Sequence, residues 1–190
     1  QELAPDPAWQ VPSGTVAFSF IAGDTNGQQG LCAKDASFFG AGGHTTIYLN
    51  GTTLVARFQD SATSATLSFG GIAAGSEFEI AATFGPGGVE LWVNGNLVDS
   101  DSLPVSWTGN AEWVQWGGRG WGSNPGQPGF DAPFNGVIAD KQIYGAVLNA
   151  SQIAALAAGS SASNSPPDAV DDAVATDEDT ALVIPISDLL

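Results

Sequence analysis

The residues with the clearest capacity for chemistry lie within positions 107–134, which read WTGNAEWVQWGGRGWGSNPGQPGFDAPF. This segment holds four of the six tryptophans, one arginine and one aspartate. An indole face stacks on the C–H face of a sugar ring, and a guanidinium with a carboxylate supplies paired hydrogen bonds to hydroxyl groups. The side chains that we expect to bind a ligand here are Trp121, Arg119, Asp131 and Asn124.

The element that must position these side chains is a long loop. Residues 117–133 contain too much glycine and proline for a regular strand, and long loops in compact domains often carry function. Trp116 and Trp113 come just before this stretch, and we interpret them as side chains of a strand that faces the core. For Trp121, contact with a ligand and packing of the loop on itself both remain open.

The remaining reactive side chains indicate less. His44 is the sole histidine and has no cysteine or second histidine nearby in sequence, so a zinc site is not predicted. We expect it to lie in a loop and to contact solvent or ligand. Cys32 is the sole cysteine, which excludes an intrachain disulfide and favours a small buried side chain. No serine occupies the setting of an activated nucleophile.

The charge of the chain limits its partners. Twenty acidic residues against four basic ones give a formal net charge of −16. Such a molecule repels phosphate backbones and anionic lipid surfaces, so nucleic acid is excluded as a partner. The acidity suits divalent cations and neutral sugars, and it equally suits solubility in a salty extracellular medium. Apolar runs of about 18 residues are missing, which predicts neither membrane insertion nor an intact signal peptide.

An alternating segment, GVELWVNGNLV at residues 88–98, predicts a β-hairpin. The residues expected on the buried face of its first strand are Val89, Leu91 and Val93. Trp92 falls on the opposite face. Asn94-Gly95 tolerates the positive φ angles of a tight turn, and Leu97-Val98 begins the return strand.

Short strands of this kind recur along most of the chain, with turn signals about every ten residues, which is typical of a two-sheet sandwich or jelly roll. Residues 134–159 then predict a strand followed by the one convincing helix. The positions expected to alternate along one face of that strand are Val137, Ala139, Lys141 and Ile143. Asn149 would cap the helix with Gln152 at the third position, and Gly159 would end it.

Two of these segments carry a resemblance to a known family. SEFEIAATFGPGGVELWVNGNLV and FNGVIADKQIYGAVLNASQI resemble the paired strands, closing strand and short helix of laminin G-like, concanavalin A-like lectin/glucanase jelly rolls. The resemblance covers about residues 14–158. It implies an all-β fold, namely a two-sheet antiparallel jelly-roll sandwich with one short C-terminal helix, over residues 1–159. The fold hosts lectins, adhesion modules, sugar-binding modules and glycosidases, so it does not decide the activity.

The composition changes after Gly159. Residues 160–167 are rich in serine, asparagine and proline and indicate a linker. The string SPPDAVDDAVATDEDTALVIP at residues 165–185 resembles the first strands of cadherin-like, immunoglobulin-like repeats of large bacterial surface and secreted proteins, and we assign residues 168–190 to such a repeat. This second resemblance implies the truncated start of a repeat in a longer protein, located outside the cell or on its surface.

The family resemblance also implies a metal. Many of its members hold one calcium ion at a sheet edge, and calcium takes six to eight oxygen ligands. The candidate ligands in this chain are Asp24, Asn26, Asp35 and Asp131. One departure weakens the resemblance at this point, because the family's closing strand often carries two successive acids where this chain has Ala139-Asp140. The sequence thus predicts at most one structural calcium ion.

Catalysis is the minority alternative. Glu77 and Glu79 alternate in SEFEIAATF, and glycoside hydrolysis needs two carboxyl groups at short range. The E-x-D-x-x-E arrangement of the related glucanases is absent, so we interpret both glutamates as solvated strand residues. Trp92 is a second candidate for ligand contact, provided that it lies on an open sheet face and not beneath a loop.

These observations predict a non-catalytic, lectin-like module that binds a polysaccharide or glycan through the loop around Arg119 and Trp121. Two alternatives remain open. A protein-adhesion or spacer module would bind a surface protein through a flat apolar patch. A polysaccharide-active glycosidase or lyase would place two carboxyl groups in a cleft.

Overall fold

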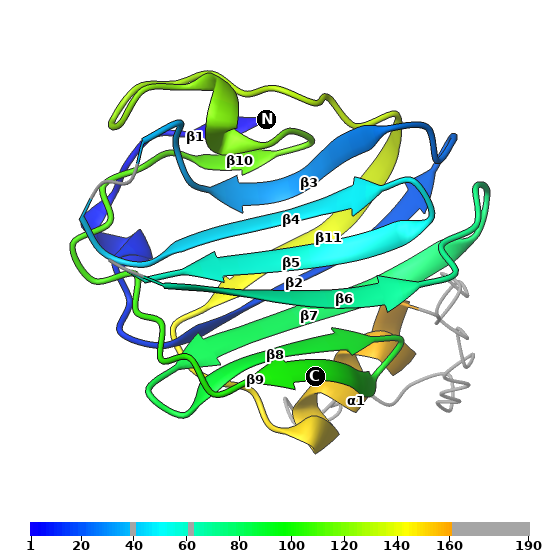
Figure 1. Cartoon of the computed structure of the whole chain (residues 1–190). Coiled ribbons are helices and arrows are strands. Elements are labelled where there is room, and N and C mark those ends of the chain that lie inside the picture. The colour runs from blue at the N-terminus through cyan, green and yellow to red at the C-terminus, as the bar shows by residue number, and fades with distance from the viewer. Residues whose placement is uncertain (39–40, 61–62, 161–190) are drawn as a thin grey trace, which may run out of the picture.

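The structure, a computed structural model, describes residues 1–38, 41–60 and 63–160. Two antiparallel sheets pack face to face, and one helix lies on the outer side of the second sheet (Figure 1). The predicted all-β sandwich with one C-terminal helix is therefore confirmed. Among the described residues, no helix is long and apolar enough to cross a membrane.

The six-stranded sheet contains, in spatial order, β1 (Glu2–Leu3), β10 (Val114–Trp116), β3 (Gln28–Lys34), β4 (His44–Asn50), β5 (Thr53–Gln59) and β6 (Ser64–Gly70). The five-stranded sheet contains β11 (Gly136–Tyr144), β2 (Gly14–Ala22), β7 (Glu77–Gly85), β8 (Gly88–Val93) and β9 (Asn96–Asp101). The helices are η1 (Pro7–Trp9), η2 (Gly120–Gly122) and α1 (Ala150–Ser160).

The core lies between the inner faces of the two sheets and is built from alternating strand positions. Trp116 is buried there, with its ring 5.5 Å from that of Phe18, which confirms its predicted core position. Trp113 is half-buried just before β10, and its indole N–H lies 3.3 Å from the Gly126 carbonyl oxygen of the following loop. Cys32 is buried and unpaired, as predicted, and burial raises the pKa of its thiol.

The predicted hairpin is present. Val89, Leu91 and Val93 of its first strand face the core between the sheets. Asn94 and Gly95 form the turn with φ angles of 50° and 76°. These left-handed conformations are the reason why an Asn-Gly pair stands at this position.

The closing strand β11 differs from its predicted alternation. Its register against β2 shifts between Ala139 and Gln142, where Asp140 takes a φ of 48°. Ile138 and Ile143 both pack on the core as a result, and Val137 faces outward. Because a bulge adds one residue to a strand, it moves every later side chain to the opposite face. A single alternation across the whole strand was therefore the wrong prediction.

Helix α1 begins as predicted. The Asn149 side chain accepts a hydrogen bond from the Gln152 amide at 3.0 Å, and the Gln152 side chain accepts one from the Asn149 amide at 3.0 Å. This reciprocal pair is a capping box. The helix extends to Ser160, one residue beyond the predicted end at Gly159. Ile153 and Leu156 on one side of the helix face the five-stranded sheet.

Candidate functional site

The glycine-rich loop after β10 lies against the outer face of the six-stranded sheet, with η2 in its middle (Figure 1). The Gly30 amide on β3 donates to the Ala132 carbonyl at 2.7 Å. A Cβ atom on Gly30 would lie 2.1 Å from the Gly118 carbonyl carbon, and one on Gly120 would lie 2.0 Å from the Asp35 carbonyl oxygen. Glycine at these two positions allows the loop to lie directly on the sheet.

Arg119 and Asp131 hold the two halves of this loop together. Their backbones form a bridge with two hydrogen bonds of 2.9 Å. Their side chains form a two-pronged ion pair, with Nε to Oδ1 at 3.0 Å and Nη2 to Oδ2 at 2.6 Å, and the guanidinium also donates to Gln28. Arg119 is only 11% exposed. The structure therefore brings these two predicted site residues together, but as partners of each other.

Trp121 lies beneath two arginines on the sheet surface. The guanidinium carbon of Arg119 is 4.4 Å from the centre of its ring, and that of Arg57 on β5 is 5.7 Å away. The ring of Tyr48 on β4 lies 6.0 Å from the same indole. Together with Asp35, these four residues form what we call the Trp121 site. The indole is half-buried, so Trp121 is partly folded inward and partly open.

Asp35, just after β3, anchors this arrangement from below. It is buried, and its carboxylate accepts hydrogen bonds from His44 Nδ1, Thr46 Oγ1 and Trp121 Nε1 at 2.7–2.8 Å. Burial alone raises the pKa of Asp35, but these hydrogen bonds outweigh it and hold the pKa below its ordinary value. The carboxylate is therefore ionised at neutral pH, and it fixes the indole in place.

His44 does not lie in a loop. It is the first residue of β4, it is fully buried, and Asp35 holds its ring. The prediction of a histidine that contacts solvent or ligand is therefore wrong. Its glycine-rich preceding residues indicated a loop, but the strand begins at the histidine itself. Its place in the structure is behind Asp35, away from any exposed surface.

A shallow hollow of about 250 Å³ opens beside Trp121. Its lining residues are Asp35, Ala36, Ser37, Arg57, Gln59 and Trp121. Arg57 is 25% exposed here and donates to Gln59 Oε1 at 2.5 Å. Phe38, which follows Ser37, is 67% exposed.

Sequence reasoning missed Arg57, Tyr48 and Phe38. A lone arginine at an outward position of the strand TLVARFQ was the available signal for Arg57, since Ala56 and Phe58 on either side point into the core. Its proximity to a loop some 60 residues away in the chain could not be inferred from local pattern.

The other predicted ligand residues lie apart from this hollow. Asn124 is exposed farther along the loop, where its carbonyl accepts a hydrogen bond from the Gln127 amide. Trp92 is only 9% exposed, because Ile153 and its neighbours on α1 cover it, and its Nε1 donates to Glu90 Oε2 at 3.0 Å. The hypothesis that Trp92 forms an open platform is therefore wrong, since a helix and not a loop covers it.

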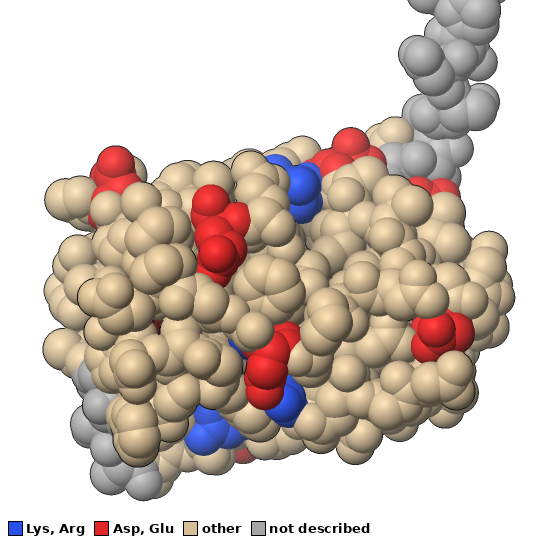
Figure 2. All heavy atoms as spheres, turned by 90° about the horizontal axis from the view of Figure 1, so that it is seen from above, with Lys and Arg blue, Asp and Glu red and all other residues tan. Residues whose placement is uncertain are grey.

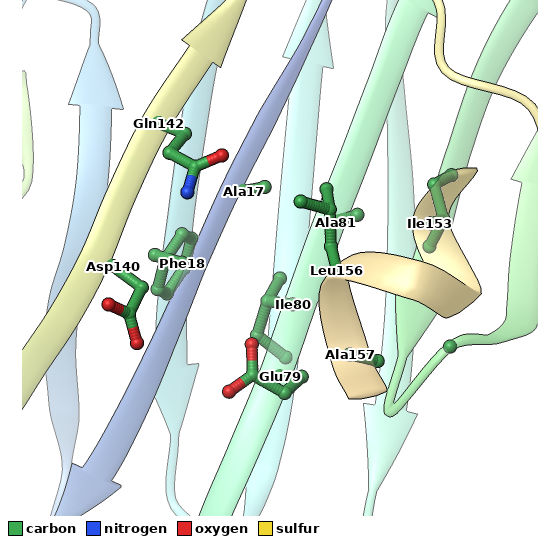
Figure 3. Close-up of a pocket in the computed structure, with 11 residues that line it drawn as sticks. Ala17, Phe18, Glu79, Ile80, Ala81, Asp140, Gln142, Ile153, Leu156 and Ala157 are labelled. Atoms are coloured by element: carbon green, nitrogen blue, oxygen red, sulfur yellow. The ribbon is translucent and has the colours of Figure 1, made fainter. Parts of the chain in front are cut away.

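A second hollow lies on the outer face of the five-stranded sheet, beside α1 (Figure 3). Figure 3 shows Asp140 of β11 and Glu79 of β7 on either side of β2. Glu77 is exposed, as expected for a solvated strand residue, and Glu79 is half-buried beside this hollow. The space is about 20 Å³, enough for one water molecule and too small for a sugar ring.

The four predicted calcium ligands do not form one donor set. Asp24 accepts hydrogen bonds from the Asn26 amide, Gln29 and Asn135, and the Asn26 bond is the main cause of its lowered pKa. Asp35 and Asp131 are occupied by the donors described above. Within the described residues, no three histidine, cysteine or acidic side chains are grouped to hold a metal ion. As they stand, these residues do not fit a shared calcium ion.

The surface seen from the side of the loop is mostly uncharged, and its few basic side chains lie close to acidic ones (Figure 2). No broad charged patch is visible on the face that the figure shows.

Comparisons with known proteins agree with this fold. A family model described as the concanavalin A-like lectin/glucanases superfamily matches residues 33–154. A search of curated protein sequences returned no match. The family match does not extend to residues 168–190, and the predicted cadherin-like repeat, which has no support from the comparisons, lies outside the described residues.

Three solved structures illustrate the similarity. The carbohydrate-binding module CBM40 of the Ruminococcus gnavus IT-sialidase, bound to α2,3-sialyllactose, aligns with a TM-score of 0.61 and 18% identity over 79% of this chain and 85% of its own. The binding domain of botulinum neurotoxin serotype G aligns with a TM-score of 0.60 and 14% identity, over 80% of this chain and 37% of its own. Mouse laminin α1 domains LG4-5 align with a TM-score of 0.60 and 13% identity, over 75% of this chain and 37% of their own. The chain thus spans little more than a third of the last two proteins, and identities this low indicate the shared fold alone.

Proposed function

Because the chain belongs to the concanavalin A-like lectin/glucanase superfamily, we propose that it is a non-catalytic module that binds carbohydrate at the Trp121 site. The observation that carries the proposal is the hollow beside Trp121, in which an aromatic ring and polar side chains meet at the surface. We also propose that the module works outside the cell or on its surface. Detection of the protein on intact cells with a specific antibody would test this location.

The chemistry of the hollow suits a sugar. Arg57, Gln59 and Ser37 provide donors and acceptors for hydroxyl groups, and the half-buried indole of Trp121 provides an aromatic face. The hydrogen bond from Trp121 to Asp35 orients the indole before any ligand arrives, which lowers the entropic cost of binding. The hollow is open and shallow, so we expect a weak interaction, with a Kd in the micromolar to millimolar range, about −4 to −8 kcal/mol.

The acidic residues near the hollow favour binding over catalysis. Of the six residues that line it, only Asp35 is a carboxylic acid, and four protein groups already donate to that carboxylate. Glycoside hydrolysis requires two carboxyl groups about 5 to 9.5 Å apart, one of them able to exchange a proton. The structural similarity to a sialyllactose-bound module supports a recognition role, although superfamily members also include glucanases.

A glycan array would test the proposal. The wild-type protein would be compared with Trp121→Ala and with Trp92→Phe, a matched tryptophan replacement on the opposite sheet. We expect Trp121→Ala to lose glycan binding and Trp92→Phe to retain it. Each array would be run with calcium and with a chelator, because calcium dependence also stays a prediction.

Three results would contradict the proposal. Unchanged binding by Trp121→Ala would place the ligand elsewhere. Capture of a surface protein without any glycan signal would favour the adhesion module, a role that one structural neighbour, a botulinum neurotoxin binding domain in complex with synaptotagmin, illustrates. Release of shortened products from a polysaccharide would favour the enzyme.

A further inference from the structure

Basic residues are rare in this chain, and two of the four meet at one indole. The chain has four lysines and arginines against twenty acids. Arg57 comes from β5 and Arg119 from the loop after β10, and both guanidinium groups lie over Trp121. The fold therefore concentrates half of its positive charge at the Trp121 site.

The two arginines have different roles. Arg119 is held by Asp131 through two hydrogen bonds, it donates further to Gln28, and its side chain is 11% exposed. Its charge is balanced and most of its donors are used. Arg119 thus fastens the loop, and little of it remains for a ligand.

Arg57 keeps donors available. Its one hydrogen bond in the described structure goes to Gln59 Oε1. The nearest carboxylate oxygen, Asp35 Oδ2, lies 3.8 Å from Nη1, which is beyond hydrogen-bond distance. That oxygen already accepts from Thr46 and Trp121. Asp35 therefore offsets the charge of Arg57 from below without occupying its remaining N–H groups.

We propose that the Trp121 site selects sugars that carry a carboxylate, and that Arg57 makes the selecting contact. This inference rests on the proposed function and names its ligand class. A guanidinium presents two parallel N–H groups that match the two oxygens of a carboxylate. Arg57 lines the hollow and is a quarter exposed, so a carboxylate on a sugar ring reaches it without displacing a protein partner.

The overall acidity of the chain makes this selection local. A net charge of −16 repels anions at long range, so the preference must come from short contacts at Arg57 and not from the general field. Acidity alone favoured neutral sugars and cations as ligands. The position of Arg57 reverses that expectation for this one surface.

Calorimetric titrations of the whole chain with chemically matched sugars test the inference. The probes are oligosaccharides of a hexuronic acid, the same oligosaccharides as neutral methyl esters, and sulfated oligosaccharides of similar length. The variants are Arg57→Gln, Arg57→Lys and, as a control of equal charge change on an exposed part of the other sheet, Lys141→Gln. Thermal unfolding of each variant confirms that it is folded.

We expect the acid form to bind about tenfold more tightly than its methyl ester, the difference expected from one charge-assisted hydrogen-bond pair. Arg57→Gln should remove this preference, Arg57→Lys should retain part of it, and Lys141→Gln should leave it intact. Equal binding of acid and ester that still depends on Trp121 would overturn the inference and leave the proposed function standing. Arg57-dependent preference for sulfate esters would overturn the carboxylate assignment. Binding of no sugar at all would overturn both.

Discussion

On the outer face of each sheet, a tryptophan is hydrogen-bonded to a carboxylate, but different groups pack over the two indole rings. Trp92 on the five-stranded sheet and Trp121 on the six-stranded sheet each donate the indole N–H to a carboxylate, Glu90 and Asp35 respectively. Helix α1 covers Trp92, with Ile153 buried against it. Two arginines cover Trp121, and an open hollow lies beside it.

The groups that pack over each tryptophan determine how much of its indole ring is exposed to solvent. An apolar helix removes the indole surface from water, and that burial stabilises the fold by about 25 cal/mol per Å². Arginines leave polar atoms at the surface and an edge of the ring within reach of a ligand. The helix face therefore contributes stability, and the Trp121 site is the face that we propose for ligand binding.

Replacing each tryptophan by alanine gives the largest test of this contrast. Trp92→Ala should lower the free energy of unfolding by about 4 kcal/mol, because it opens a cavity between α1 and the sheet. Trp121→Ala should cost about 1–2 kcal/mol, because the ring is only half-buried, and it should remove glycan binding. Urea unfolding and glycan titration of both variants measure the two effects. A larger stability loss for Trp121→Ala would reverse the assignment of the two faces.

Replacing the carboxylates that bind the two indoles should also change the free energy of unfolding by different amounts, and by less than the tryptophan replacements. Asp35→Asn should destabilise the protein by about 3 kcal/mol, because an amide cannot accept all the hydrogen bonds that the buried carboxylate receives. Glu90→Gln should cost about 1 kcal/mol, because Glu90 is half-buried and, within the described part of the chain, accepts hydrogen bonds from two side chains, Trp92 and Thr83. Equal losses in urea unfolding would show that Asp35 does not anchor its site.

Acid should act on the same carboxylate. The folded-state pKa of Asp35 lies below its ordinary value of 3.8, so its contribution to stability is present above that pH and is lost as the pH falls through the lower folded-state value. The difference in stability between wild-type protein and Asp35→Asn should therefore narrow as the pH is lowered from neutral to below about 4. Urea midpoints of both proteins across this range check the expectation. A constant gap between them would contradict it.

Local patterns predicted most of the fold because they act over a few residues. Alternation and the Asn94-Gly95 turn placed the β8–β9 hairpin, and Asn149 with Gln152 placed the start of α1. The bulge at Asp140 was not predicted, because an extra residue in a strand has no distinct sequence signal. The burial of Trp92 by α1 was not predicted either, because the position of the helix on the sheet depends on contacts between residues far apart in the chain.

The candidate site was predicted only in part, and the reason is again distance along the chain. Composition indicated Trp121 and Arg119 because they share one unusual loop. Arg57 and Tyr48 come from strands that pair with each other and meet that loop only after the sheet has formed. His44 was misread as a contact for solvent or ligand, because its hydrogen bond with Asp35 depends on the pairing of β3 with β4.

The smallest expected effect separates the two arginines of the Trp121 site. A double-mutant cycle with Arg119→Gln and Asp131→Asn should give a coupling energy of about 1 kcal/mol in urea unfolding, since Asp131 is 38% exposed and water screens the pair. Both single variants should keep the preference for acidic sugars, because Arg119 fastens the loop and Arg57 makes the selecting contact. Coupling near zero together with a lost acid preference would transfer the ligand contact to Arg119. The loop that carries Arg119 would then be part of the binding surface, whereas α1 only covers Trp92.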